Sequence, residues 1–307
     1  MTSGRIDVHQ HLVPAAYAGR LRDHGITAPG GRKLPGWSPA MALELMDRQG
    51  IATALLSLTT PGVHLGDDRE AAAAAREFNE FGAELVKDHP GRFGLLATLT
   101  LPYVDGAVTA AAHALDELSA DGVVLLANSH GRYLGDPSFD PLMAELDRRG
   151  AVVLVHPAEL PGPAAAGIPP FAADFLLDTT RAAYGLVRHD VPRRFPGIRF
   201  VLAHAGGFLP YAAHRLAVSL FDQTGRDPAT ILDDLAGFYF DTALSSSPAA
   251  LPSLLSFARP GHVLYGSDWP FAPELAVTYF NGPIAQDESI GHRNARALFH
   301  RFDNDPP

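Results

Sequence analysis

Eight short apolar runs recur along the chain, and longer stretches that predict helices separate them. The runs cover residues 5–8, 51–58, 93–99, 122–127, 151–155, 198–203, 238–241 and 262–266. Several are almost continuously apolar, which is typical of parallel strands buried on both faces. The predicted helices cover residues 39–49, 67–87, 104–118, 140–149, 173–188, 248–257 and 289–299, and a further helix is opened by Gly206 and Gly207.

This alternation predicts an α/β fold, a single (β/α)8 TIM barrel spanning residues 1–307 as one domain. A doubly wound sheet is the alternative, but it rarely needs eight repeats and would not bring the first and last strands together. Residues 12–38 are rich in Gly and Pro, so we expect a loop insertion after strand 1 without regular structure. Ser38 and Pro39 are suited to the N-cap and first position of the helix that follows.

Polar residues that can bind a metal stand at the carboxyl ends of four predicted strands. His9 and His11 close the first run, His156 the fifth, His204 the sixth, and Asp268 follows the eighth. Side chains two apart on a strand point to one face, so His9 and His11 can act together. Because a parallel barrel collects these strand ends at one mouth, we expect the five side chains to converge.

Three histidines and one carboxylate, without sulfur, predict a site for one divalent metal, Zn²⁺ first, with Mn²⁺ or Fe²⁺ also tolerated. His9, His11, His156 and Asp268 are the predicted ligands. His204 is either a fifth ligand or, as we favour, a proton shuttle, and Asp268 also suits proton transfer. Taken singly, each has a plainer interpretation: a polar strand end, a core histidine, or an Asx turn before Pro270.

Composition removes several classes of function. The chain has no cysteine, which excludes disulfides and a thiol nucleophile and fits a cytoplasmic location. With 34 acidic against 24 basic residues, the formal net charge is -10, so we expect no nucleic-acid partner. No uninterrupted apolar stretch reaches about 18 residues, so we expect no membrane span.

Seven segments together resemble one family, the amidohydrolase superfamily, in its branch of aminocarboxymuconate semialdehyde decarboxylase. The segments are residues 6–14, 44–51, 89–93, 155–157, 195–196, 203–211 and 266–271. Residues 178–181 (Asp-Thr-Thr-Arg) and 62–64 (Gly-Val-His) look most similar to 6-methylsalicylate decarboxylase-like members. The resemblance implies the ligand set given above, with His204 as the catalytic acid/base.

The resemblance also implies a homodimer, because Arg215 stands where the family has an arginine that reaches into the partner's site. About 12 Å of helix separates Arg215 from Gly207, too far to serve its own barrel mouth easily. The family's other carboxylate-binding arginine precedes a Trp-x-Pro segment. Here Arg32 and Lys33 precede Trp37, a departure that makes a simple aromatic acid at least as good a substrate as the muconate semialdehyde.

We therefore expect a metal-dependent, non-oxidative decarboxylase of a small aromatic or unsaturated carboxylic acid, of the hydroxybenzoate or 6-methylsalicylate type. Protonation of a ring carbon would precede loss of CO2, with Tyr211, Trp269 and Phe271 as walls for the ring. The alternative is a hydrolase of a lactone, amide or C–C bond, in which the same ligands hold hydroxide. A non-enzymatic binding module is the third possibility.

Overall fold

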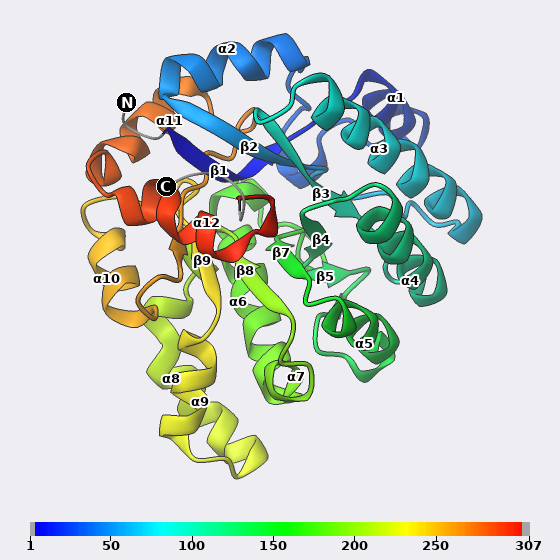
Figure 1. Ribbon diagram of the computed structural model, residues 1–307. Helices are drawn as coiled ribbons and strands as arrows, with labels where there is room; N and C mark the ends of the chain where they lie inside the picture. The colour runs from blue at the N-terminus through cyan, green and yellow to red at the C-terminus, as the bar shows by residue number, and fades with distance from the viewer. Residues whose placement is uncertain (1–3, 303–307) are drawn as a thin grey trace.

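Eight parallel strands form a nearly closed barrel in the computed structural model, which describes residues 4–302 (Figure 1). The strand order is β1-β2-β3-β4-β7-β8-β9-β10, and every neighbouring pair is parallel. Their bounds are β1 Arg5–His11, β2 Ile51–Ser57, β3 Phe93–Thr98, β4 Gly122–Leu126, β7 Val152–His156, β8 Arg199–Leu202, β9 Tyr239–Asp241 and β10 Val263–Leu264. The predicted (β/α)8 barrel is confirmed.

The segment after β10 closes the barrel against β1. The Val8 amide donates to the carbonyl of Tyr265 (2.9 Å), the Asp268 amide to that of His9 (2.8 Å), and the His11 amide to that of Trp269 (2.8 Å). These backbone bonds continue the parallel ladder past the end of the short β10. They also fix Asp268 beside the two histidines of β1.

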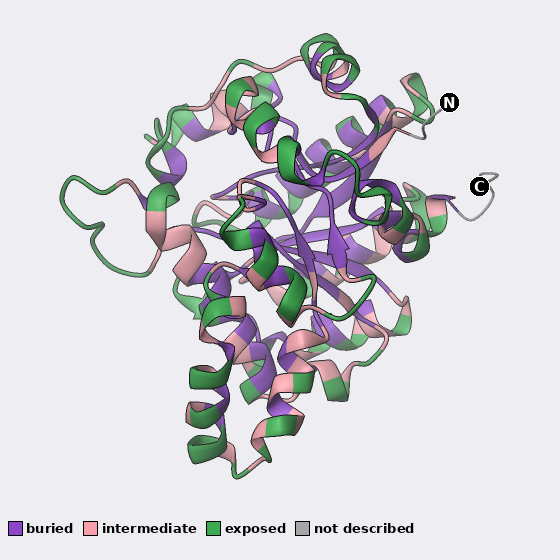
Figure 2. Ribbon diagram, turned by 90° about the vertical axis from the view of Figure 1, so that its left-hand side faces the viewer, coloured by how far each residue is buried: buried purple, intermediate pink, exposed green. Residues whose placement is uncertain are grey.

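Helices surround the barrel and expose only their outer faces (Figure 2). They are α1 Ala15–Asp23, α2 Pro39–Gln49, α3 Asp68–Asp88, α4 Val104–Ala112, α5 Asp140–Arg148, α6 Pro170–Arg188, α7 Val191–Arg194, α8 Leu209–Thr224, α9 Pro228–Ala236, α10 Ala250–Phe257, α11 Glu274–Asn281 and α12 Asn294–Leu298. As predicted, the Ser38 hydroxyl caps α2 by accepting the Met41 amide (3.2 Å) and Pro39 begins the helix. In the residues described, no helix is both long and apolar enough to cross a membrane.

The insertion after strand 1 is more regular than we expected. Helix α1 and a 3-10 turn at Pro29–Gly31 lie within residues 12–38, so the prediction of a segment without regular structure is wrong. Tyr17 and Leu21, four residues apart, bury one face of α1, and the Tyr17 hydroxyl donates to the Thr59 carbonyl (3.2 Å). Tertiary packing therefore stabilises a helix that could not be predicted from the sequence, because glycines and prolines surround it.

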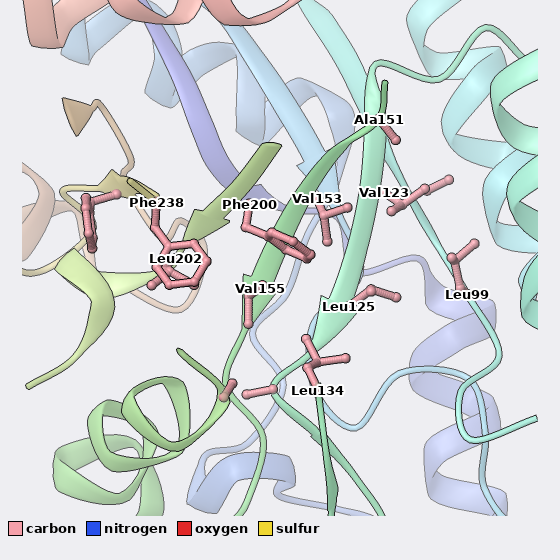
Figure 3. Close-up of a cluster of buried hydrophobic side chains, with 14 of the residues drawn as sticks. Leu99, Val123, Leu125, Leu134, Ala151, Val153, Val155, Phe200, Leu202 and Phe238 are labelled. Carbon is pink, nitrogen blue, oxygen red and sulfur yellow. The ribbon is translucent and has the colours of Figure 1, made fainter. Parts of the chain in front are cut away.

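Two apolar layers fill the protein. Inside the barrel, side chains from β1, β3, β4, β7 and β8 pack on Leu298, Phe299 and Phe302, which cover the amino ends of the strands. Outside it, alternate residues of β4, β7 and β8 face the helices (Figure 3). Because the amino end is filled with hydrocarbon, only the carboxyl end of the barrel is left for a polar site.

A bulge in β1 sets the direction of the two histidines. Asp7 pairs with Ala54 and Gln10 with Leu56, so β1 advances three residues where β2 advances two. Val8 belongs to the cluster inside the barrel, and strict alternation would then turn His9 outward. The extra residue reverses the alternation, so that His9 also faces inward.

Candidate active site

Five polar side chains converge at the carboxyl end of the barrel, as the sequence predicts. One ligand atom from each of His9, His156, His204 and Asp268 lies within 4.8 Å of all the others. His11 joins them, since its Nε2 lies 3.1 Å from His9 Nε2 and 3.1 Å from Asp268 Oδ1. His9, His11 and His156 are at most 2% exposed and His204 and Asp268 are 7% exposed, so water competes little for these atoms.

All four histidines are held in the same tautomer by an oxygen at Nδ1. His11 faces the Ser57 carbonyl (3.3 Å), His156 the Pro157 carbonyl (2.8 Å) and His204 the Ala243 carbonyl (3.0 Å). His9 faces a carboxylate oxygen of Asp241 instead (2.8 Å). A carbonyl or carboxylate oxygen can only accept, so Nδ1 carries a proton, and in the neutral ring Nε2 is left with a lone pair.

The positions of these donor atoms show whether the site suits a metal ion. His9 Nε2 and His11 Nε2 stand 3.1 Å apart with Asp268 Oδ1 3.1–3.5 Å away, and when both rings are neutral the two nitrogen lone pairs repel each other. A divalent ion between nitrogen and carboxylate donors removes that repulsion, and the absence of sulfur suits zinc or manganese. The donor set therefore fits a divalent metal.

Burial and neighbouring charges shift the pKa values of these groups in opposite directions. Burial lowers the pKa of His11 and, together with the charges of His11 and His9, lowers that of His156 well below its ordinary value. For His9 the effect of burial is outweighed by the carboxylate of Asp241, which raises the pKa to about 9. For Asp268 burial is outweighed by the hydrogen bond to His11 and the charges of His204 and His9, so its pKa falls below the usual range.

His204 and Asp268 both have left-handed backbone, with φ of 53° and 58°. A non-glycine residue in this region is uncommon, and such strain persists where surrounding contacts enforce it. The enforcing contact at His204 is Asp241, whose Oδ1 accepts the His204 amide (3.0 Å) and the Ala243 amide (3.0 Å). Asp241 thereby fixes both the side chain of His9 and the main chain of His204.

Sequence reasoning missed Asp241. It is the last residue of β9 and is fully buried. The signal was available, since a carboxylate ending an apolar run obeys the rule that pointed to His156 and Asp268. Its role could not be read because it lies behind the histidines and does not itself face the centre.

A cavity of about 340 Å³ opens above this centre. His156, His204 and Asp268 form part of its lining, and phenylalanine rings supply much of the remainder, from Phe171, Phe175, Phe271 and Phe280. The insertion after β1 contributes Pro29, Gly30 and Arg32. The cavity therefore presents an apolar wall suited to a ring, polar groups at the metal centre, and one guanidinium.

Of the four predicted substrate-binding residues, only Phe271 lines the cavity. Phe271 lines the cavity and meets the His11 ring edge-on, with ring centroids 5.3 Å apart. Trp269 is 8% exposed in the apolar core and is not part of the cavity lining. Tyr211, 90% exposed, and Arg215, also exposed, lie on α8 outside the lining of their own cavity.

The sequence did not decide whether Arg32 or Lys33 could bind a substrate carboxylate, and in the structure only Arg32 lies at the cavity. Arg32 borders the cavity, stacks over the Phe171 ring (5.4 Å to the centroid) and donates to the carbonyl of Phe271. Lys33 is exposed and is not among the lining residues.

The chain belongs to the amidohydrolase family, whose sequence profile matches residues 6–301. Its relatives include a decarboxylase, macB, of Penicillium terrestre, which is 37% identical over 97% of this chain and 95% of its own length. The 6-methylsalicylic acid decarboxylase of Penicillium expansum is 36% identical over 90% of this chain and 88% of its own.

Solved structures agree on the fold. The crystal structure of an amidohydrolase II superposes with a TM-score of 0.90 and 32% identity, covering 96% of this chain and 99% of that one. A dihydroxybenzoic acid decarboxylase from Polaromonas sp. JS666, with bound manganese and the inhibitor 2-nitroresorcinol, superposes with a TM-score of 0.79 and 23% identity over 100% of this chain and 98% of its own. The barrel is thus shared along its whole length.

Proposed function

We propose that the protein is a metal-dependent, non-oxidative decarboxylase of a small aromatic carboxylic acid of the hydroxybenzoate or 6-methylsalicylate type. The observation that carries the proposal is a buried centre of inward-facing imidazoles and a carboxylate beneath a cavity walled by phenylalanine rings. Relatives matched along nearly the whole chain are decarboxylases by name, which favours decarboxylation over hydrolysis on the same scaffold.

His9, His11, His156 and Asp268 would hold the metal in this proposal, zinc first and manganese second. The metal supplies Lewis-acid attraction for the substrate carboxylate and a neighbouring hydroxyl. The Nδ1 partners described above turn the three imidazoles so that each presents a lone pair.

His204 would deliver the proton. Its Nδ1–H is bonded to the Ala243 carbonyl, and the side chain borders the cavity. When His204 is protonated at Nε2 it can transfer that proton to the ring carbon that bears the carboxylate. The C–C bond then breaks, its electron pair restores the aromatic ring, and CO2 leaves. Asp268 is the second candidate for moving a proton.

Arg32 would orient the anionic substrate from the wall of the cavity. A guanidinium binds carboxylate or phenolate oxygens through hydrogen bonds as well as charge. In a chain with a net charge of -10, a cation at this position also attracts an acid that the rest of the surface repels.

The homodimer belongs to this proposal as well. Helix α8 exposes Tyr211, Arg215, Val218 and Phe221, which are spaced so that they share one face. We propose that this face meets a second copy, so that Arg215 and Tyr211 reach the partner's cavity. Sedimentation at working concentration tests the dimer. Sedimentation as a monomer, with the Arg215→Ala rate unchanged, would contradict it.

The decisive assay follows metal content and then CO2 release from hydroxybenzoates, including 6-methylsalicylate, in D2O. We expect one metal per chain, CO2 release, and deuterium at the vacated ring carbon. Metal without CO2 from any acid, followed by turnover of a lactone or amide, would replace the decarboxylase with the hydrolase. Fractionation of the producing cells tests the cytoplasmic location that the lack of cysteine suggested.

A further inference from the structure

We propose that Asp178 is a positioning residue that acts on His156 through a single peptide group. No part of Asp178 faces the centre, and the inference rests on the proposed role of His156 as a metal ligand. The Asp-Thr-Thr-Arg segment that begins at Asp178 has no other part in the site described above.

The connection passes through the peptide that joins Pro157 to Ala158. His156 Nδ1 donates to the carbonyl oxygen of Pro157 (2.8 Å). The amide of Ala158, which belongs to the same peptide group, donates to Asp178 Oδ2 (2.8 Å). The peptide therefore lies between an imidazole on one side and a carboxylate on the other.

Asp178 itself is held firmly. It is fully buried on α6, and its Oδ1 accepts the side-chain amide of Asn128 (2.9 Å). Burial raises the pKa of Asp178, and hydrogen bonds from Ala158, Tyr133 and Asn128 oppose that rise. The three donors favour the ionised carboxylate, whereas burial favours the neutral form.

A carboxylate at the amide end of a peptide strengthens the bond at the carbonyl end. The N–H that donates to a negative charge polarises the group and makes the carbonyl oxygen more negative, because hydrogen bonds in a chain reinforce one another. A stronger acceptor at Nδ1 fixes the ring and raises the basicity of Nε2, as it does for metal-binding histidines generally.

The comparison with His9 supports this assignment. His9 has its carboxylate directly, at 2.8 Å from Asp241, and stands on β1. His156 stands on β7, four strands away in the order of eight and so across the barrel. The two facing histidines are each backed by a buried carboxylate, one in direct contact and one through a peptide.

Asp178→Asn tests the proposal, because it removes the charge and nearly keeps the shape. The matched control is Asp121→Asn, at a carboxylate that also accepts a backbone amide (Leu95, 2.8 Å) but precedes β4 at the other end of the barrel. We would measure Zn²⁺ affinity by competition with a chromophoric chelator, and the visible absorption of the Co²⁺ form.

We expect Asp178→Asn to weaken Zn²⁺ binding by about tenfold, the low end of the range for groups behind metal ligands, and to shift the Co²⁺ bands. Asp121→Asn should lower thermal stability and leave both readings unchanged. If Asp178→Asn does not fold, Asp178→Ser, which leaves room for a bridging water, replaces it.

Two negative results are distinguishable. In the first, His156→Gln abolishes tight metal binding while Asp178→Asn binds Zn²⁺ as the wild type does, with unchanged Co²⁺ bands. The proposed role of Asp178 is then wrong, and the proposed role of His156 as a metal ligand is retained. If His156→Gln binds Zn²⁺ as the wild type does, the proposed ligand set itself is wrong.

Discussion

Each histidine at the barrel mouth is oriented by an oxygen at its Nδ1, supplied by β2, by the residue after His156, or by the end of β9 and the loop that follows it. Three of these oxygens are main-chain carbonyls, which no substitution of a side chain can remove. The fourth belongs to Asp241, so His9 is the one histidine of the four whose Nδ1 faces a side-chain oxygen and no main-chain carbonyl.

Asp241→Asn should therefore weaken metal binding more than any change behind the other three histidines. The amide cannot supply the charge that raises the pKa of His9 to about 9, and it offers a donor where His9 needs an acceptor. We expect a loss of about 10–100-fold in affinity for Zn²⁺, measured by chelator competition. Equal affinity in variant and wild type would show that the charge behind His9 is dispensable.

Gly30→Ala should damage the cavity rather than the metal centre. Gly30 has φ of +67°, and an added Cβ would stand 2.6 Å from the Phe175 ring, which lines the cavity. We expect KM to rise several-fold as Phe175 is displaced, with metal content unchanged. Gly25→Ala is the control, because Gly25 also has positive φ (+72°) but nothing lies within 4 Å of its Cβ position. If both variants behave alike, backbone strain alone explains the effect.

At the scale of elements, local pattern and tertiary contact contribute differently. The carboxyl ends of β7 and β8 follow from apolar runs alone, so His156 and His204 could be placed from the sequence. The inward direction of His9 depends on a bulge against β2, which strict alternation does not predict. Helix α1 was not predicted, because the glycines and prolines around it indicate irregular structure. Asp241 and Asp178 could not be assigned because their contacts join residues 20 or more positions apart.

A stacked pair of rings joins the first residue of β9 to the residue before β10. The rings of Tyr239 and His262 lie 4.0 Å apart and nearly parallel, and His262 Nδ1 donates to the Phe238 carbonyl. Burial lowers the pKa of His262 from its ordinary 6.5, so the folded protein binds this proton less readily than the unfolded chain.

The free energy of unfolding should consequently fall as the pH drops below about 6.5, because protons then favour the unfolded state. Urea denaturation at pH 7.5 and 5.5 measures the fall, and His262→Gln should show a smaller one. The exposed His300→Gln provides the comparison. Identical pH dependence in wild type and His262→Gln would remove His262 as a cause.

For the whole molecule, stability and chemistry reside at opposite ends of the barrel. The amino end is packed with Leu298, Phe299 and Phe302 and contains no part of the candidate centre. The fold therefore has a core that does not require the metal, whereas the carboxyl end carries the groups that do.

Removal of the metal by a chelator should accordingly abolish activity, and the protein should stay folded. We expect an unchanged far-ultraviolet circular dichroism spectrum and a Tm lower by about 5 °C, since a ligand at 100 times its Kd contributes about 2.7 kcal/mol. Added Zn²⁺ or Mn²⁺ should restore both. Loss of the spectrum on chelation would mean that the metal is required for folding, as in small zinc domains.

The spacing of the candidate ligands along the chain has a consequence for how the protein is made. Asp268 is added to the growing chain 257 residues after His11. No shorter piece of the barrel assembles the full set of donors. The complete site can therefore bind a metal only after the whole barrel has been synthesised. Metal binding by all four candidate ligands would then indicate that the segment after β10 has paired with β1.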